Sequence, residues 1–503
     1  KAVTGEDYAD FVQKEILEPL GMRHSAYPIE PFADGTFAKP YRGDHLLAQE
    51  FVGALASGGL YSTPSDLVRL GSMLMNGGAF GTTRILSPGA VAAMAEDQTS
   101  GTFNPVPSDS WRFGLGWDTV SEEGLAAVGV RAWQKGGDVV SYGSALIVAP
   151  DERLSVAVTG ASGIGSSQST NVAERILLRA LLEKGRISAM PEPVAAAKTA
   201  KIALSEASHQ AIEGIYVNSS MVLQAGFAEN GTLYLRNFAQ GEWVDMMGGF
   251  EPRDGGRFVS ESIPGIEIRW SEAEGRAYII LDMVSGAGHY YSPMMFAQRV
   301  DPARALSAVW QERAGKVWLP VNFDADDEYI APTKDPRATL LAIEELSGYV
   351  AVQGPDGIMV GKPAVSLDGT AGRDFEAHFF ILIPQLMGRD LFDIVVLPKG
   401  EEEWLRLGSS LYRPVESLAL LPVGAADLAI GPEGLAEWRR VPADASVETL
   451  GATAWKLYDS SFSQIGAGLG DAESVSTPGG GEGYFLLYGL AGSNVHVSVK
   501  HSP

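Results

Sequence analysis

Residues Trp133-Gln134-Lys135-Gly136-Gly137-Asp138 form a run in which two glycines directly follow a cation. Strand-forming residues lie before this run at 113–117 and after it at 144–149 and 154–159, and Pro150-Asp151 indicates a hairpin turn between the last two. We expect 133–138 to be an edge strand beside this hairpin. Apolar residues at helical spacing predict helices at 64–75, 88–95 and 171–183. Helices together with an antiparallel sheet are typical of an α+β domain.

The predicted edge strand has a composition that suits substrate binding. Gly136 and Gly137 let a substrate backbone approach the strand closely. The ammonium of Lys135 is able to hold a carboxylate or to take part in proton transfer, and the backbone N–H of Asp138 is able to stabilise an oxyanion. The alternative is a glycine-rich turn with an exposed lysine, and the spacing alone leaves this alternative open.

Composition excludes several classes of function. The 503 residues include 38 Lys and Arg against 62 Asp and Glu, and the net charge of −24 argues against nucleic acid and anionic membrane surfaces as partners. There is no cysteine, which excludes disulfides and cysteine metal sites. The longest apolar runs are much shorter than the roughly 20 residues that span a membrane. Because zinc motifs and phosphate-binding loops are also absent, the sequence predicts neither a metal nor a cofactor.

Changes in composition divide the chain into modules. We expect residues 1–186 to form the α+β domain and 187–205, which are rich in Pro, Ala and Lys, to form a linker. Beyond the linker, short strand patterns alternate with Gly, Asn and Asp turns, as in small antiparallel barrels. We expect a first barrel-like module at 206–300, a connection at 301–340 and a second β-rich module at 341–503.

Four elements of residues 1–186 resemble, in order, the C-terminal part of the serine beta-lactamase-like family. They are Thr4-Gly5 through Pro19-Leu20-Gly21-Met22, Ser62-Thr63-Pro64-Ser65-Asp66-Leu67, Phe113-Gly114-Leu115-Gly116-Trp117, and Lys135-Gly136-Gly137 with its hairpin. This family includes class C beta-lactamases, penicillin-binding DD-peptidases, esterases and D-aminopeptidases. The resemblance implies a beta-lactamase-like α/β sandwich, incomplete at its N-terminus. As in the D-aminopeptidases, two lipocalin-like antiparallel barrels would follow.

The resemblance also implies roles for a few residues. Lys135 would contact a substrate carboxylate or the proton relay, and Gly136 and Gly137 would admit the substrate to the strand. The backbone N–H of Asp138 would supply half of the oxyanion hole. Two indoles are candidates for the walls of the substrate pocket, with core packing as the alternative; they are Trp117 and Trp133.

The nucleophile of the family is missing from the sequence. In the family, the nucleophile comes from a Ser-x-x-Lys element, and a second catalytic element reads Tyr-x-Asn or Ser-x-Asn. No serine in this sequence is followed by Lys three positions later. The only Tyr-x-Asn, Tyr216-Val217-Asn218, falls in the β-rich part. We therefore expect the nucleophile on an upstream segment of the same domain, which is either cleaved off or a separate chain.

The expected function is that of one part of a serine hydrolase. Such an enzyme forms an acyl-enzyme with a D-amino-acid-containing peptide, a beta-lactam or an ester. The alternative is a non-catalytic protein that binds peptides or glycans. The resemblance implies a periplasmic or secreted location, and it leaves a homo-oligomer open.

Overall fold

The computed structural model describes residues 2–43, 45–47, 49–99, 101–103, 112–194, 199–239, 241–286, 288–302, 305–323, 325, 335–354, 359–366, 375–378, 381–383, 386–388, 393–477, 479 and 481–501. The chain divides into two compact units. The first comprises Lys1–Lys198, Ile263–Glu267 and Leu281–Met294, and the second comprises Thr199–Ser262, Ile268–Ile280 and Met295–Pro503. Within the described residues, no helix combines the length and the apolar character that crossing a bilayer requires.

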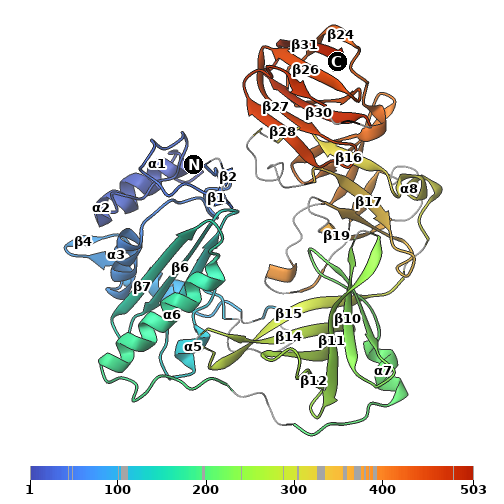
Figure 1. Ribbon diagram of the computed structural model, residues 1–503. Coiled ribbons are helices and arrows are strands. Elements are labelled where there is room, and N and C mark those ends of the chain that lie inside the picture. The colour runs from blue at the N-terminus through green and yellow to red at the C-terminus, as the bar shows by residue number, and fades with distance from the viewer. Residues whose placement is uncertain are drawn as a thin grey trace. The chain divides into compact units, whose positions relative to one another are not determined.

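A three-stranded antiparallel sheet lies at the centre of the first unit (Figure 1). Its strands are β5 (Trp133–Asp138), β6 (Tyr142–Ala149) and β7 (Leu154–Ala161), in the order β5-β6-β7. The edge strand and the hairpin predicted from the sequence are therefore confirmed. The expected strand at 113–117 is wrong, because Gly116 has a φ of +82° and Gly114 N donates to Trp117 O, which turns the chain.

Helices cover both faces of this sheet, as expected for a beta-lactamase-like fold. Side chains alternate along β6, so odd and even positions face opposite layers. On one face an apolar cluster joins β6 to α6 (Ser166–Glu183); its members include Ile147, Ala149, Leu177, Leu178 and Leu181. On the other face a cluster joins β6 to α3 (Pro64–Met75); its members include Leu146, Val148, Met73 and Leu74.

The remaining elements of the first unit are short. Helix α1 (Tyr8–Val12) continues through a π-helical turn (Gln13–Leu17) into α2 (Glu18–Leu20), and Gly21 ends it in a left-handed conformation. Ser87 caps α4 (Pro88–Met94) with its side chain. The others are β1 (Tyr41–Arg42), β2 (His45–Leu46), β3 (Ala79–Phe80), β4 (Thr83–Arg84) and α5 (Glu123–Ala126). Helix α6 begins five residues before its predicted start at 171, because its first turn is polar and carries no apolar periodicity.

Two closed antiparallel barrels of eight strands each follow in the chain. The first follows α7 (Glu206–Ile212) and closes where β15 pairs with β8. Its strands are β8 (Gly214–Val217), β9 (Val222–Phe227), β10 (Leu233–Ala239), β11 (Glu242–Arg253), β12 (Arg257–Val259), β13 (Ile266–Ala273), β14 (Arg276–Ser285) and β15 (Tyr290–Val300).

The second barrel follows α8 (Ala308–Arg313) and closes where β23 pairs with β16. Its strands are β16 (Val317–Pro320), β17 (Ala338–Ala342), β18 (Tyr349–Gln353), β19 (Met359–Ser366), β20 (Glu376–His378), β21 (Ile394–Lys399), β22 (Glu402–Leu407) and β23 (Ser410–Pro414). Short 3-10 turns lie at Leu386–Gly388 and Val415–Ser417.

The chain ends in two four-stranded sheets, ordered β24-β31-β26-β29 and β25-β30-β27-β28. Their strands are β24 (Gly424–Ala429), β25 (Glu437–Val441), β26 (Ala445–Leu450), β27 (Ala452–Tyr458), β28 (Gln464–Leu469), β29 (Val475–Ser476), β30 (Gly483–Gly489) and β31 (Asn494–His501). Trp438 packs with Leu319 of the second barrel, and its Nε1 donates to Pro320 O at 2.7 Å.

The β-rich part therefore differs from the expected modules. Strand β16 lies within 301–340, where we expected a connection, and 341–503 contains most of a barrel and a separate pair of sheets. Strand β16 has only four residues, which is too short for an alternating pattern to stand out. The last two sheets have the same short strands and polar turns as the barrels, so composition does not mark the boundary.

We predict that Gly71→Ala destabilises the first unit. A Cβ at Gly71 would lie 2.9 Å from both Cβ and Oγ of Ser155, because α3 packs closely on the sheet. Overpacking costs about 1–3 kcal/mol, which exceeds the ~1 kcal/mol that alanine contributes to a helix. The matched control is Gly89→Ala in α4, where the nearest atom would be 3.9 Å away. Calorimetry should show a lower unfolding temperature for the first variant and not for the second; equal behaviour would contradict the packing argument.

Candidate functional site

The outer edge of β5 presents backbone groups away from the sheet. Strand β5 pairs only with β6, and in an antiparallel pair alternate residues point their N–H groups to opposite sides. Gln134 N donates outward to Thr119 O at 2.8 Å, and Gly136 N donates outward to Asp118 Oδ2 at 2.7 Å. By the same alternation, the N–H of Asp138 points outward. The edge is thus covered by 118–119 at its beginning and presents Asp138 N–H at its end.

Lys135 is held at this edge by an ion pair with Asp118. Its Nζ lies 3.0 Å from Asp118 Oδ1 and also donates to Gly136 O. Both side chains are about half exposed, so the pair contributes little to stability, on the order of 0–1 kcal/mol. Its effect is positional, because one carboxylate fixes both the Lys135 ammonium and the Gly136 N–H. Sequence reasoning missed Asp118, whose only local signal is that it directly follows Trp117.

The two glycines of the edge have close neighbours, Gly136 at the start of α6 and Gly137 on β6. A Cβ at Gly136 would lie 3.0 Å from Ser166 Cβ, and a Cβ at Gly137 would lie 2.7 Å from Ser144 Oγ. Both positions therefore have a packing reason to be glycine, besides the substrate access that the sequence suggested.

The side chain of Asp138 anchors the end of β5 to the start of α6. Its Oδ1 accepts a hydrogen bond from Ser166 N at 2.6 Å, and its Oδ2 accepts one from Ser166 Oγ. A carboxylate at the N-terminus of a helix satisfies a free N–H and complements the helix dipole. This anchor holds the Asp138 backbone in place, and with it the outward N–H.

The structure places Trp117 and Trp133 in the core, which corrects their assignment as substrate-binding residues. The two side chains are 6% and 4% exposed, and they belong to the apolar cluster between the sheet and α3. Their ring centroids are 5.6 Å apart. Trp133 lies one residue from Gln134 along β5, and alternation turns it to the α3 face. Core packing, the alternative that the sequence left open, is the role that these contacts support.

A group of aromatic residues packs where β6 begins, close in sequence to the end of β5. Tyr142 lies edge-on to Tyr61 at 5.3 Å and donates from its hydroxyl to Ala38 O at 2.6 Å. Burial raises the pKa of Tyr142, so its hydroxyl remains a donor. Glu50 accepts from Ser141 N at 2.6 Å. These contacts tie the segment around 38–61 to the β5–β6 turn, and no sequence motif pointed to them.

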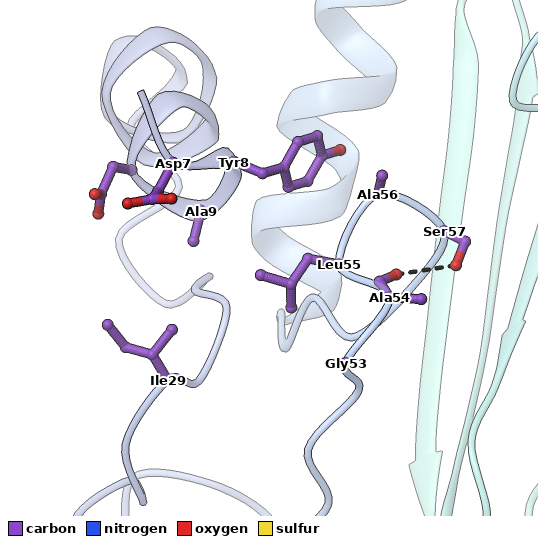
Figure 2. A pocket seen from close by; sticks show the side chains of 10 residues that line it. Asp7, Tyr8, Ala9, Ile29, Gly53, Ala54, Leu55, Ala56 and Ser57 are labelled. Atoms are coloured by element: carbon purple, nitrogen blue, oxygen red, sulfur yellow. Dashed lines mark hydrogen bonds between the residues drawn. The ribbon is translucent and has the colours of Figure 1, made fainter. Parts of the chain in front are cut away.

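A separate hollow of about 700 Å³ lies beside α1 (Figure 2). It is lined by Asp7, Tyr8, Ala9, Asp10, Ile29, Gly53, Ala54, Leu55, Ala56 and Ser57. None of these residues belongs to β5, so this hollow and the Lys135 edge are different places on the unit. Among the residues described by the structure, no three or more His, Asp or Glu side chains are arranged to hold a metal ion.

We predict that Asp118→Ala loosens the β5 edge without unfolding the unit. The Gly136 N–H loses its acceptor and Lys135 loses its partner, so the Gly136 amide should exchange its hydrogen about tenfold faster. Hydrogen exchange measured by NMR or mass spectrometry tests this. Asp151→Ala is the control, because Asp151 also pairs with a cation, Arg131, at an exposed site. Unchanged protection at Gly136 would show that Asp118 does not hold the edge.

Comparison with known proteins adds a family and distant structural relatives. No curated protein matches the chain. Among solved structures, the chain is similar to the octameric penicillin-binding protein homologue from Pyrococcus abyssi, with 19% identity over 59% of this chain and 60% of that chain, and a TM-score of 0.31. It is similar to SurE, with 20% identity over 59% of this chain and 64% of that chain (TM-score 0.39). It is also similar to SurE with D-Leu, with 20% identity over 59% of this chain and 63% of that chain, and a TM-score of 0.38.

The chain spans less than two thirds of the length of each of these solved structures, between 60% and 64%. The family model described as Beta-lactamase matches the first part of the chain, over the region that contains the three-stranded sheet and most of α6. The match covers residues 1–179, so this part of the chain is similar to the beta-lactamase family.

Proposed function

We propose that residues 1–186 are one part of a serine hydrolase that forms an acyl-enzyme, and that the outer edge of β5 is one wall of its active site. One observation carries this proposal. The Lys135 ammonium, the Gly136–Gly137 backbone and the outward N–H of Asp138 lie in succession on an open strand edge. The match of residues 1–179 to the Beta-lactamase family model supports the reaction class, because members of that family are generally serine hydrolases.

The edge suits the chemistry of acyl transfer. When a serine hydroxyl adds to a substrate carbonyl, the negative charge develops on the carbonyl oxygen. The N–H of Asp138 donates one hydrogen bond to that oxygen, and the second donor comes from the nucleophile's own segment. An ammonium at Lys135 favours negative charge nearby and can join the proton relay that returns a proton to the leaving group.

The substrate we propose is an amide, a small peptide containing a D-amino acid, a beta-lactam or an ester. The structure bears on how strongly a carboxylate would bind. Lys135 already pairs with Asp118, and Gly136 offers no hydroxyl, so the edge holds a substrate carboxylate weakly. This favours substrates that are positioned mainly by their backbone along the strand.

We propose that the nucleophile comes from an upstream Ser-x-x-Lys segment, either cleaved off or on a separate chain. The basis is that none of the serines in the 503 residues has Lys three positions later. Without that segment, the edge described above provides binding and half of an oxyanion hole and carries no nucleophile.

We propose further that the two eight-stranded barrels are lipocalin-like modules, because both are closed and antiparallel and each follows a short helix. We also propose a periplasmic or secreted location, as is frequent in the family, and a homo-oligomer. Size-exclusion chromatography with light scattering tests the last of these.

Labelling with a fluorophosphonate or a penicillin tests the enzyme proposal. The protein is used as its source cell makes it, together with any segment that remains bound. Mass spectrometry should find the label on a serine that has Lys three positions later. If no serine in the assembly is labelled, the hydrolase proposal is wrong and the non-catalytic binding protein remains.

We predict that Lys135→Ala lowers turnover of a substrate found by this labelling by about tenfold to a thousandfold, because it removes a positive charge beside the reacting carbonyl. The unfolding temperature should not change, since Lys135 is half exposed. Lys184→Ala is the control, because Lys184 is an exposed lysine of the same unit whose Nζ donates to Glu152 O. A normal rate in Lys135→Ala would remove Lys135 from the mechanism.

A further inference from the structure

Residues 288–292 pack against α5 and α6 within the first unit, which includes Leu281–Met294. His289 and Tyr290 make the contacts. His289 Nε2 lies 2.9 Å from Gly124 O, and the Tyr290 hydroxyl donates to Glu174 Oε2 at 3.1 Å. Because a carbonyl only accepts, His289 Nε2 carries the hydrogen in its bond to Gly124, and His289 Nδ1 faces Glu174 Oε1 at 3.7 Å. We call residues 288–292 the latch segment.

Three carboxyl groups gather under the latch segment. Glu122 and Glu123 come from the start of α5, and Glu174 comes from the middle of α6. Glu174 is fully buried and Glu122 is 3% exposed. The Glu174 carboxylate fits between two backbone positions, since a Cβ at Gly124 or at Gly286 would collide with it. The enclosure leaves little room for the water that would normally solvate these charges.

Glu122 and Glu123 retain their protons at a pH where exposed carboxyl groups do not. Burial raises the pKa of Glu122 to about 8, and the charge of Glu174 adds to the effect. Burial raises the pKa of Glu123 to about 7, although a hydrogen bond from Ser292 of the latch segment opposes the shift. Burial also raises the pKa of Tyr290, which keeps its hydroxyl protonated as the donor to Glu174.

We propose that the latch segment is a pH-operated latch, closed on α5 and α6 when Glu122 and Glu123 hold their protons beside the buried Glu174, and released when both are ionised. The facing groups are Glu122 and Glu123 from α5, Glu174 from α6, and His289 and Tyr290 from the segment itself. Ionised carboxylates at Glu122 and Glu123 beside the buried Glu174 carry a large desolvation cost, because the closed site leaves little room for water. Opening the segment lets water reach the carboxylates and removes that cost.

The direction of the pH effect follows from the raised pKa values. The closed form binds protons that the open form releases, because Glu122 and Glu123 regain ordinary acidity when water reaches them. Closure is therefore strongest below the ordinary carboxyl pKa, and it weakens as the pH rises towards about 8. This inference is independent of the proposed hydrolase function, since none of its residues lies on β5.

Hydrogen exchange of the intact chain between pH 5.5 and 8.5 tests the latch. Protection factors, which are corrected for the intrinsic pH dependence of exchange, should fall in 288–292 and α5 as the pH rises. Where opening releases one proton, protection should fall tenfold per pH unit. This applies at pH values between the pKa of that carboxyl group in the open form and its raised pKa in the closed form. Protection that does not change with pH would overturn the proposal.

Two variants assign the effect to the cluster. Glu122→Gln keeps the oxygen that accepts from Leu125 N and removes the titrating group, so the pH dependence should become shallower. Glu123→Gln is a second, less buried variant that should act in the same way if the first does not fold. Glu183→Gln is the control on α6, because Glu183 is exposed, and it should keep the original slope. An original slope in both cluster variants would also overturn the proposal.

Discussion

Strand β6 is buried on both of its faces, and the rest of the first unit depends on this constraint. Leu146 and Val148 pack towards α3, whereas Ile147 and Ala149 pack towards α6. A strand covered on both faces also needs hydrogen-bonding partners on both sides, because unpaired backbone groups are costly in a dry interior. Strands β5 and β7 supply them, and the outer side of β5 is left for residues 118–119 to cover at its beginning, with Asp138 N–H pointing outward at its end. The position of the candidate active-site edge thus follows from packing in the neighbouring strand.

Much of the first unit could be predicted because its signals are local. The apolar run of β6, the Pro150-Asp151 turn and the helix-capping residues each act within a few positions of the sequence. The run at 113–117 misled because Phe113, Leu115 and Trp117 alternate with glycines as they would in a strand. Here the glycines serve a turn, and Gly116 adopts a left-handed conformation that a local pattern does not reveal.

In the candidate site, too, residues that are neighbours in the sequence could be predicted, whereas contacts between residues far apart in the sequence could not. Lys135, the two glycines and Asp138 were found because they adjoin one another in sequence. Asp118 was missed, since its contact with Lys135 spans 17 positions and arises from the bridge between Thr119 and Gln134. For Trp133 the sequence left a pocket wall and core packing both open, because a motif gives the order of residues but not the face on which each one lies. The carboxyl cluster on α5 and α6 was missed for the same reason.

Asp138 combines two roles that belong to different parts of one residue. Its side chain caps α6, whereas the group aimed at the open edge is its backbone N–H. Ordinary mutational scanning at this position therefore reports on the helix cap and leaves the N–H in place. Only proline would delete that donor, and proline would also restrict the strand backbone. This N–H, which we propose as an oxyanion donor, is thus encoded by the path of the chain, so neither residue identity at 138 nor tolerance to substitution there is a measure of its importance.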